Sequence, residues 1–177
     1  MRLFIAIELP DALKNELRSL QDPAEGIRWQ ATGQLHITLK FLGDTTVDRV
    51  KDLKYRLNNL QSPSFSISVK GLGKFPKKGN PKVIWVGVSK SKKLFQLQEK
   101  VEKSCLKLGF EKGRRTFVPH ITLGRVKKDG EVEAYRILRK PFAYPEKITV
   151  NHFTLFESRL SPEGAQHKAL ERYELGL

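Results

Sequence analysis

The sequence predicts an α+β protein with two similar lobes, each containing an antiparallel sheet flanked by helices. Short strand-like segments are mixed with helix-like segments along the whole chain, which is typical of this class. The tetrapeptide His-Ile-Thr-Leu occurs at residues 36–39 and again at 120–123, a spacing close to half of the 177-residue chain. Such a repeat indicates an internal duplication. Because no Gly/Ser-rich linker separates the halves, residues 1–177 are predicted to be a single bilobal domain with one motif in each lobe.

The first half of the chain predicts two helices and several strands. Residues 2–9 are rich in aliphatic and β-branched side chains and predict a buried strand. Pro10 and Asp11 are suited to opening the first helix. A strand, a turn at Thr32 and Gly33 and a second strand follow up to residue 43. The second helix is predicted over residues 45–60, with Thr45 or Thr46 as N-cap and this apolar face: Val47, Val50, Leu53, Leu57 and Leu60.

The second half repeats this mixture. Residues 65–75 alternate in polarity and predict one half-buried strand, and 82–88 predict an apolar strand. The segment 73–82 between them contains four lysines and turn residues and is predicted to be a mobile basic loop or hairpin tip. A long helix ends near Gly109, and its apolar stripe places Cys105 in the core. A short helix over 131–139 and two strands, 147–158 and 167–175, complete the chain.

Composition restricts the class of partner and the compartment. The 33 Lys and Arg residues exceed the 19 Asp and Glu residues, for a formal net charge of +14, which favours a polyanion such as nucleic acid over the alternative of a merely solubilising surface. A lone cysteine forms no internal disulfide, and the apolar run at residues 3–7 is too short for a signal peptide or a membrane span. A cytoplasmic protein that does not enter a membrane is therefore expected. Because no obligate dimer seam is apparent in the sequence, a monomer is expected.

The two motifs place like residues on one face. Side chains alternate along a strand, so His36 and Thr38 point away from the core, about 7 Å apart, while the flanking aliphatic residues point into it. His120 and Thr122 repeat the pattern. Two such strands related by a pseudo-dyad would bring two imidazoles and two hydroxyls to one cleft between the lobes.

This set of groups suits cleavage of a P–O bond. One histidine can accept a proton from the attacking oxygen while the other donates one to the leaving oxygen, and the hydroxyls can donate hydrogen bonds to the non-bridging oxygens. A zinc site is the weaker alternative, because no further ligand lies in these strands and threonine binds metals poorly. His152 and His167 have no matching partner in the repeat and are interpreted as structural residues.

The segments FIAIELP, LHITLKFLG, VIWVGV, FVPHITLGRV and ALERYEL resemble the two-histidine phosphoesterase superfamily, and within it the LigT-like RNA 2′,3′-cyclic phosphodiesterases, also called ThpR and historically 2′-5′ RNA ligases. The resemblance extends over nearly the whole chain, and the paired His-x-Thr motifs are its most specific part. It implies a bilobal fold with the active cleft between the lobes, and no metal or other cofactor.

The resemblance also implies residue roles. His36 and His120 would be the catalytic pair, with His36 as acid and His120 as base, and Thr38 and Thr122 would bind the phosphate. The expected reaction is hydrolysis of an RNA terminal 2′,3′-cyclic phosphate to a 2′-phosphomonoester. Arg125 would contact the substrate phosphate, although strict strand alternation turns it to the opposite face unless a bulge at Gly124 redirects it.

Other residues are candidates for contacts with RNA, and the sequence allows other functions. Additional candidates for contacts with RNA are Phe4, Lys77, Lys78, Arg114, Arg115, Lys127 and Lys128. The alternative functions are ligation of a cyclic-phosphate end to a 5′-hydroxyl, hydrolysis of another cyclic or 2′,5′-linked nucleotide, and non-catalytic RNA binding driven by charge.

Overall fold

The computed structural model describes residues 1–176 and confirms the α+β class; Leu177, the last residue of the predicted domain, lies outside the described residues. The elements are β1 (Arg2–Glu8), α1 (Asp11–Arg18), β2 (Ile27–Trp29), the 3-10 turn η1 (Thr32–Gln34), β3 (His36–Asp44), α2 (Val47–Asn58), β4 (Phe65–Ile67), β5 (Val69–Phe75), β6 (Val83–Val88), α3 (Lys92–Leu106), β7 (His120–Val126), α4 (Glu131–Leu138), β8 (Ile148–Val150), β9 (His152–Ser161) and β10 (Gly164–Glu174).

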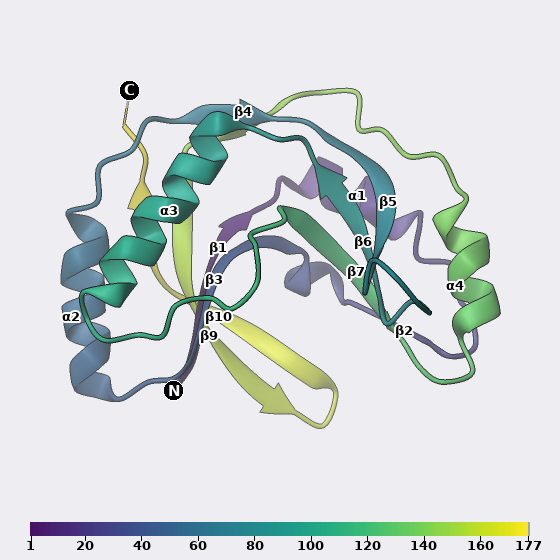
Figure 1. Ribbon diagram of the computed structural model, residues 1–177, viewed down its shortest axis with the longest axis horizontal. Helices are drawn as coiled ribbons and strands as arrows, with labels where there is room; N and C mark the ends of the chain where they lie inside the picture. The colour runs from purple at the N-terminus through teal and green to yellow at the C-terminus, as the bar shows by residue number, and fades with distance from the viewer. Residues whose placement is uncertain (177) are drawn as a thin grey trace.

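The strands form two antiparallel halves that meet at the motif strands. The order is β10-β9-β1-β3-β7-β6-β5, with β2 also paired to β7, and β4 and β8 form a separate small sheet. Between β3 and β7 the paired residues are Ile37 and Ile121. Figure 1 shows α2 and α3 beside the half that contains β1, β3, β9 and β10, which we call the first lobe. Helices α1 and α4 lie beside β2, β5, β6 and β7, the second lobe. Each lobe therefore contains one motif.

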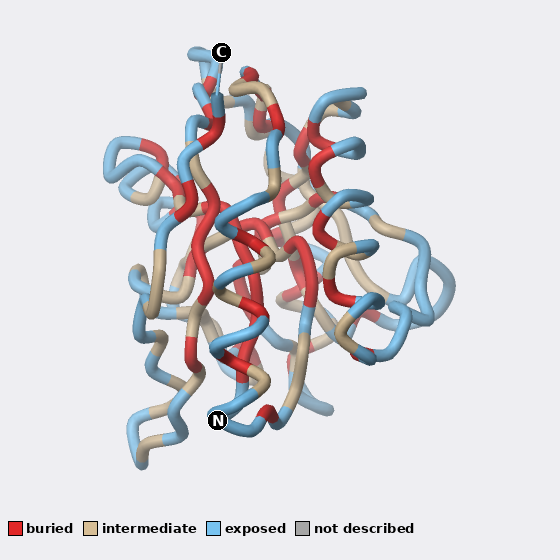
Figure 2. Tube along the Cα trace, turned by 90° about the vertical axis from the view of Figure 1, so that its left-hand side faces the viewer, coloured by how far each residue is buried: buried red, intermediate tan, exposed pale blue. Residues whose placement is uncertain are grey.

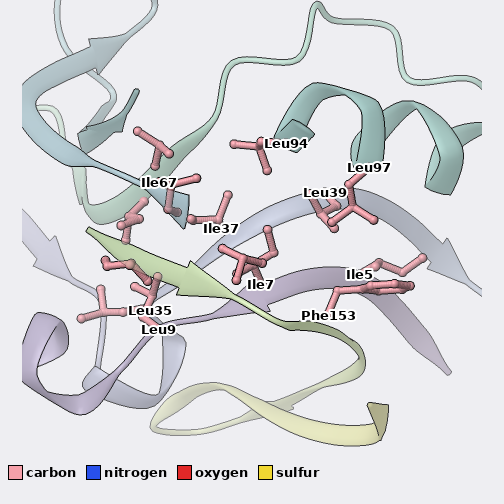
Figure 3. Close-up of a cluster of buried hydrophobic side chains, with 14 of the residues drawn as sticks. Ile5, Ile7, Leu9, Leu35, Ile37, Leu39, Ile67, Leu94, Leu97 and Phe153 are labelled. Carbon is pink, nitrogen blue, oxygen red and sulfur yellow. The ribbon is translucent and has the colours of Figure 1, made fainter. Parts of the chain in front are cut away.

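The inward face of each motif strand is part of the hydrophobic core. Ile37 and Ile121 are fully buried, and Leu39 is 3% exposed. Leu94 and Leu97 of α3 point toward this face of β3 in Figure 3. Figure 2 shows buried residues concentrated in the central strands and on the inner sides of the helices. Because burial of each large aliphatic side chain contributes roughly 1.5–3 kcal/mol, this packing fixes which face of each strand is left for the cleft.

A bulge occurs at the same place in both motifs. Along β1 and β3, Ile5 pairs with Lys40 and Ala6 pairs with Thr38, so Leu39 is an extra residue. Along β6 and β7, Ile84 pairs with Gly124 and Trp85 pairs with Thr122, so Leu123 is the extra residue. An extra residue reverses the alternation beyond it. The residue five positions after each histidine consequently returns to the exposed face.

Lys40 anchors the first bulge in the interior. This lysine is 6% exposed. Its Nζ lies 3.0 Å from both carboxylate oxygens of Glu102 on α3 and donates to the Glu111 carbonyl at 2.8 Å. Glu102 also accepts from the Gly113 amide at 3.0 Å. The ion pair thus ties β3 to α3 and to the loop that leads into β7.

Most predicted elements are confirmed, and three details are wrong. Residues 147–158, predicted as one strand, form β8 and β9, which are separated at Asn151 and belong to different sheets. Residues 65–75 form two strands in different sheets, separated at Ser68, because β4 pairs with β8 while β5 pairs with β6. Val47 is 63% exposed, since it is the first residue of α2 and precedes the turns that pack on the core.

Three local predictions agree with the structure. Helix α2 begins after Thr46, although that hydroxyl makes no capping hydrogen bond. Cys105 is buried, and burial raises the pKa of its thiol to about 12. The basic segment 73–82 is a hairpin tip in which Lys74 donates to the carbonyls of Pro76, Lys77 and Gly79.

Within residues 1–176, no helix is both long and apolar enough to cross a bilayer.

Candidate active site

A cleft of about 650 Å³ contains all five side chains that the sequence predicted. Strands β3 and β7 contribute His36, Thr38, His120, Thr122 and Arg125. Residues of β1, of β2 and of the β9–β10 hairpin complete its walls. Residues that are distant in the sequence therefore meet here because the two motif strands are neighbours in the sheet.

His36 is held between a hydroxyl and an aromatic ring. Its Nε2 lies 2.9 Å from Oγ1 of Thr38, so the two polar groups of the first motif are in hydrogen-bond contact. The Phe4 ring packs on the imidazole with centroids 5.0 Å apart. Burial, followed by the nearby His167, lowers the pKa of His36 to about 4, although a hydrogen bond to the Gln34 backbone opposes this.

His120 has a defined tautomer. Its Nδ1 lies 2.6 Å from the Val118 carbonyl oxygen, which can only accept, so Nδ1 carries the proton. In the neutral ring, Nε2 is then the acceptor. The Phe75 ring meets the imidazole edge to face at 4.9 Å. Burial lowers the pKa of His120, against a smaller raising effect of the hydrogen bond to Val118.

The lowered pKa values mean that both imidazoles favour the neutral form in the empty cleft. Each neutral imidazole has one nitrogen that can accept a proton. The negative charge of a bound phosphate would raise the pKa of either ring. One ring could then be protonated beside the ligand while the other stayed neutral.

Arg125 lines the cleft because of the bulge at Leu123. Strict alternation would have turned it to the core face, whereas the extra residue leaves Gly124 buried and Arg125 exposed. A side chain at Gly124 would clash with Trp29, because a Cβ there would lie 2.7 Å from Cε3 of the indole. The equivalent position in the first lobe is Phe41, which is 74% exposed and also lines the cleft.

His167, which sequence reasoning interprets as structural, also lines the cleft. It lies on β10 with its ring 5.2 Å from that of His36 and 4.7 Å from that of Phe4. Burial lowers its pKa as well. Its placement depends on β10 pairing with β9 and β9 pairing with β1, which no local pattern reports. Arg28, which sequence reasoning did not single out, also lines the cleft.

The remaining candidates differ in their surroundings. His152 lies outside the cleft lining, and its Nε2 contacts the Glu8 carboxylate at 3.1 Å, which agrees with its interpretation as a structural residue. Phe4 lines the cleft but is only 3% exposed, because its ring packs on His36 at 5.0 Å and on Phe156 at 5.2 Å. These basic residues are exposed and lie outside the cleft lining: Lys77, Lys78, Arg114, Arg115, Lys127 and Lys128. Among residues 1–176 no group of three or more His, Cys, Asp or Glu side chains is arranged to hold a metal ion.

Known proteins share both the sequence and the fold. The family model described as the 2′-5′ RNA ligase superfamily matches residues 9–161. An Archaeoglobus fulgidus protein named RNA 2′,3′-cyclic phosphodiesterase is 33% identical, over 98% of this chain and all of that protein. A Thermotoga maritima protein of the same name is 32% identical, over 96% of this chain and 93% of its own. The crystal structure of E. coli LigT in apo form is 27% identical, with a TM-score of 0.84 over 99% of this chain and 98% of that chain. The chain therefore belongs to the 2′-5′ RNA ligase superfamily.

Proposed function

We propose that this protein hydrolyses the terminal 2′,3′-cyclic phosphate of RNA to a 2′-phosphomonoester. The observation that carries the proposal is the presence of both His-x-Thr pairs in one cleft between two lobes. The relatives named RNA 2′,3′-cyclic phosphodiesterase, at about a third identity over nearly the whole chain, support the choice of substrate. The formal net charge of +14 suits an RNA ligand.

The proposed reaction is an in-line displacement at phosphorus. His120 accepts a proton from water as the water oxygen bonds to phosphorus, and this role suits a ring whose Nδ1 proton is held by Val118. His36 donates a proton to the 3′ oxygen as the bond from that oxygen to phosphorus breaks. The substrate's negative charge supports this role, because it raises the pKa of His36 from the low value of the empty cleft.

The hydroxyls and the guanidinium act on the phosphate oxygens. Thr38 and Thr122 donate hydrogen bonds to the non-bridging oxygens, where negative charge grows in the transition state. Arg125 lies at the edge of the same cleft, and its guanidinium donates hydrogen bonds to the substrate phosphate. No step requires a metal ion.

Ligation is the second candidate, favoured by the description of the matching family as 2′-5′ RNA ligases. With a 5′-hydroxyl in place of water, the same two histidines would form a 2′-5′ bond by the reverse of a cleavage reaction. Non-catalytic RNA binding is less well supported, because binding alone gives no role to a matched pair of titratable rings in the cleft.

The deciding experiment uses a short RNA with a 2′,3′-cyclic phosphate end, incubated in EDTA with and without a second RNA that has a 5′-hydroxyl. We expect a 2′-phosphomonoester as the main product under both conditions. A joined RNA as the main product would establish ligation, and loss of activity in EDTA would contradict the metal-free mechanism.

Three further properties belong to this proposal. The lone buried thiol of Cys105 suits the reducing cytoplasm, where we place the protein. We also propose that residues 1–177 are a single domain and that the chain acts as a monomer, since each chain holds both motifs of one cleft. Sedimentation of the purified protein tests the last point.

A further inference from the structure

The basic segment 73–82, the hairpin tip between β5 and β6, starts beside the ring of His120. Phe75 is the last residue of β5, and its ring meets that imidazole at 4.9 Å. At the other end of the tip, Val83 is the first residue of β6 and pairs with Arg125 of β7. Figure 1 shows the tip beside the ends of β7 and β2. The segment therefore borders the cleft on the side of the second lobe.

One lysine holds this tip in a defined shape. Nζ of Lys74 donates to three backbone carbonyls, at 3.0, 2.9 and 2.7 Å, those of Pro76, Lys77 and Gly79. Pro81, close to the end of the tip, is buried. The other lysines of the segment are consequently presented by a preorganised loop, which lowers the entropy cost of binding a ligand.

Three exposed lysines of the tip have no acidic partner within residues 1–176. They are Lys77, Lys78 and Lys82, and none of the ion pairs in that part of the chain includes them. Residues 69–88, which comprise β5, the tip and β6, contain five Lys and no Asp or Glu. Strand β7 contains no acidic residue either. The three charges are therefore balanced by solvent ions, which a bound polyanion would release.

The rim of the cleft on the first lobe has a different charge balance. There Arg2 lies opposite Asp44 in the β1–β3 ladder, and Arg159 forms an ion pair with Glu157 at 2.9 Å. Residues 152–174, which include the hairpin that borders this rim, contain four Glu against three Lys and Arg. A chain of phosphates that leaves the cleft is therefore attracted to the rim of the second lobe.

We propose that the basic segment 73–82 binds the phosphate backbone of the RNA, along the nucleotides that precede the cyclic end. The cyclic phosphate occupies the two motif pairs, so the nucleotides on its 5′ side leave the cleft across the rim. Lys77, Lys78 and Lys82 contact phosphates and not bases, and they add affinity for a strand without a preference for its sequence. This inference rests on the proposed function and adds the path of the strand over the protein.

The first test measures binding of a single-stranded RNA of about 12 nucleotides that ends in a 2′-phosphate, by fluorescence anisotropy at several salt concentrations. The variant combines Lys77→Gln, Lys78→Gln and Lys82→Gln. Each lysine–phosphate contact contributes about 0.7 to the slope of log affinity against log salt, so the variant should have a slope smaller by about 2. Between about 50 and 200 mM salt, the wild-type protein should then lose roughly 10- to 20-fold more affinity than the variant.

The matched control removes the same charge from the helices beside the first lobe. It combines Lys51→Gln, Lys93→Gln and Lys107→Gln, three exposed residues of α2, of α3 and of the C-cap of α3. This control should keep the wild-type slope. Equal slopes in the two triple variants would assign the effect to net charge and overturn the proposal, as would a wild-type slope in the tip variant.

Turnover separates failure of the RNA-binding tip from failure of the proposed function. The ratio of kcat/KM for the same RNA with a 2′,3′-cyclic end to kcat/KM for adenosine 2′,3′-cyclic phosphate is compared in wild type and tip variant. We expect this ratio to fall roughly 10-fold in the variant, through KM of the RNA. Hydrolysis of both substrates with an unchanged ratio leaves the proposed function standing and overturns the tip. If neither is hydrolysed, the proposed function fails, whereas a reduced salt slope still supports RNA binding by the tip.

Discussion

The imidazole rings of His36 and His167 meet edge to face, with centroids 5.2 Å apart and an interplanar angle of 65°. The two residues come from β3 and β10, which are not neighbouring strands, and the Phe4 ring contacts both imidazoles. Protonation of one ring opposes protonation of the other, since like charges at this distance repel. We infer that His167 influences the protonation of His36.

Replacing His167 should therefore change the pH dependence of the reaction. After burial, the charge of His167 is the next cause that lowers the pKa of His36, so His167→Phe should raise that pKa while keeping the ring packed. A proton donor with a higher pKa stays protonated to higher pH. The limb of the pH profile of kcat/KM that reports His36 should thus move to higher pH.

His152→Gln serves as the control for that profile, because His152 contacts Glu8 and lies outside the cleft lining. A profile for His167→Phe that stays in place, or moves to lower pH, would contradict the coupling. A shift of the same size in His152→Gln would assign the effect to histidine content in general.

Removing either motif histidine should abolish most of the turnover. His36→Ala and His120→Ala each eliminate one proton-transfer group, and general acid–base catalysis contributes typically 10²–10⁴-fold. We expect losses of that size with an unchanged far-UV circular dichroism spectrum. Full activity in either variant would refute the assigned pair.

The threonine hydroxyls give a finer test of phosphate stabilisation. Thr122→Val keeps the shape of the side chain but removes the donor, and loss of one such donor costs roughly 10²–10³ in kcat. Thr122→Ser keeps the hydroxyl and should retain most of the activity. Equal kcat values in the valine and serine variants would show that the hydroxyl is not used.

Lys40 is expected to matter for stability and not for the chemistry. Lys40→Met leaves the Glu102 carboxylate without its buried partner, and breaking such a pair costs about 3 kcal/mol of the free energy of unfolding. Urea titration measures the loss. The double variant Lys40→Met with Glu102→Met should recover part of it, because no unpaired charge remains.

The matched control is Lys103→Met, which removes an exposed pair with Glu99 on the same helix. Surface pairs of this kind contribute between about 0 and 1 kcal/mol. Equal destabilisation by Lys40→Met and Lys103→Met would mean that burial of the first pair has no energetic consequence.

The sequence was sufficient for the parts of the site that depend on local alternation. His36 and Thr38 share a face because they are two residues apart on one strand, and the buried Ile37 fixes which face that is. Repetition of the tetrapeptide then predicted the second pair. The helices followed from apolar spacing in the same way, except at Val47, where the first residue of a helix has no core beside it.

The remaining parts of the site depend on pairing between distant strands. The direction of Arg125 follows from the bulge at Leu123, and Gly124 was the one local sign of it. Arg28 reaches the cleft because β2 pairs with β7, and His167 because the C-terminal hairpin adds to β1. The pairing register of these strands depends on backbone hydrogen bonds across the sheet. Such hydrogen bonds produce no recognisable pattern in the local sequence.

Cys105, described above as a core residue, also makes this chain a convenient host for spectroscopic probes. Its sulfhydryl is enclosed, and only the thiolate reacts rapidly with maleimides. A new cysteine at the exposed Leu160, on the hairpin that borders the cleft, would be labelled selectively without first removing the natural one. A fluorophore attached there would report directly on nucleotides entering between the two lobes.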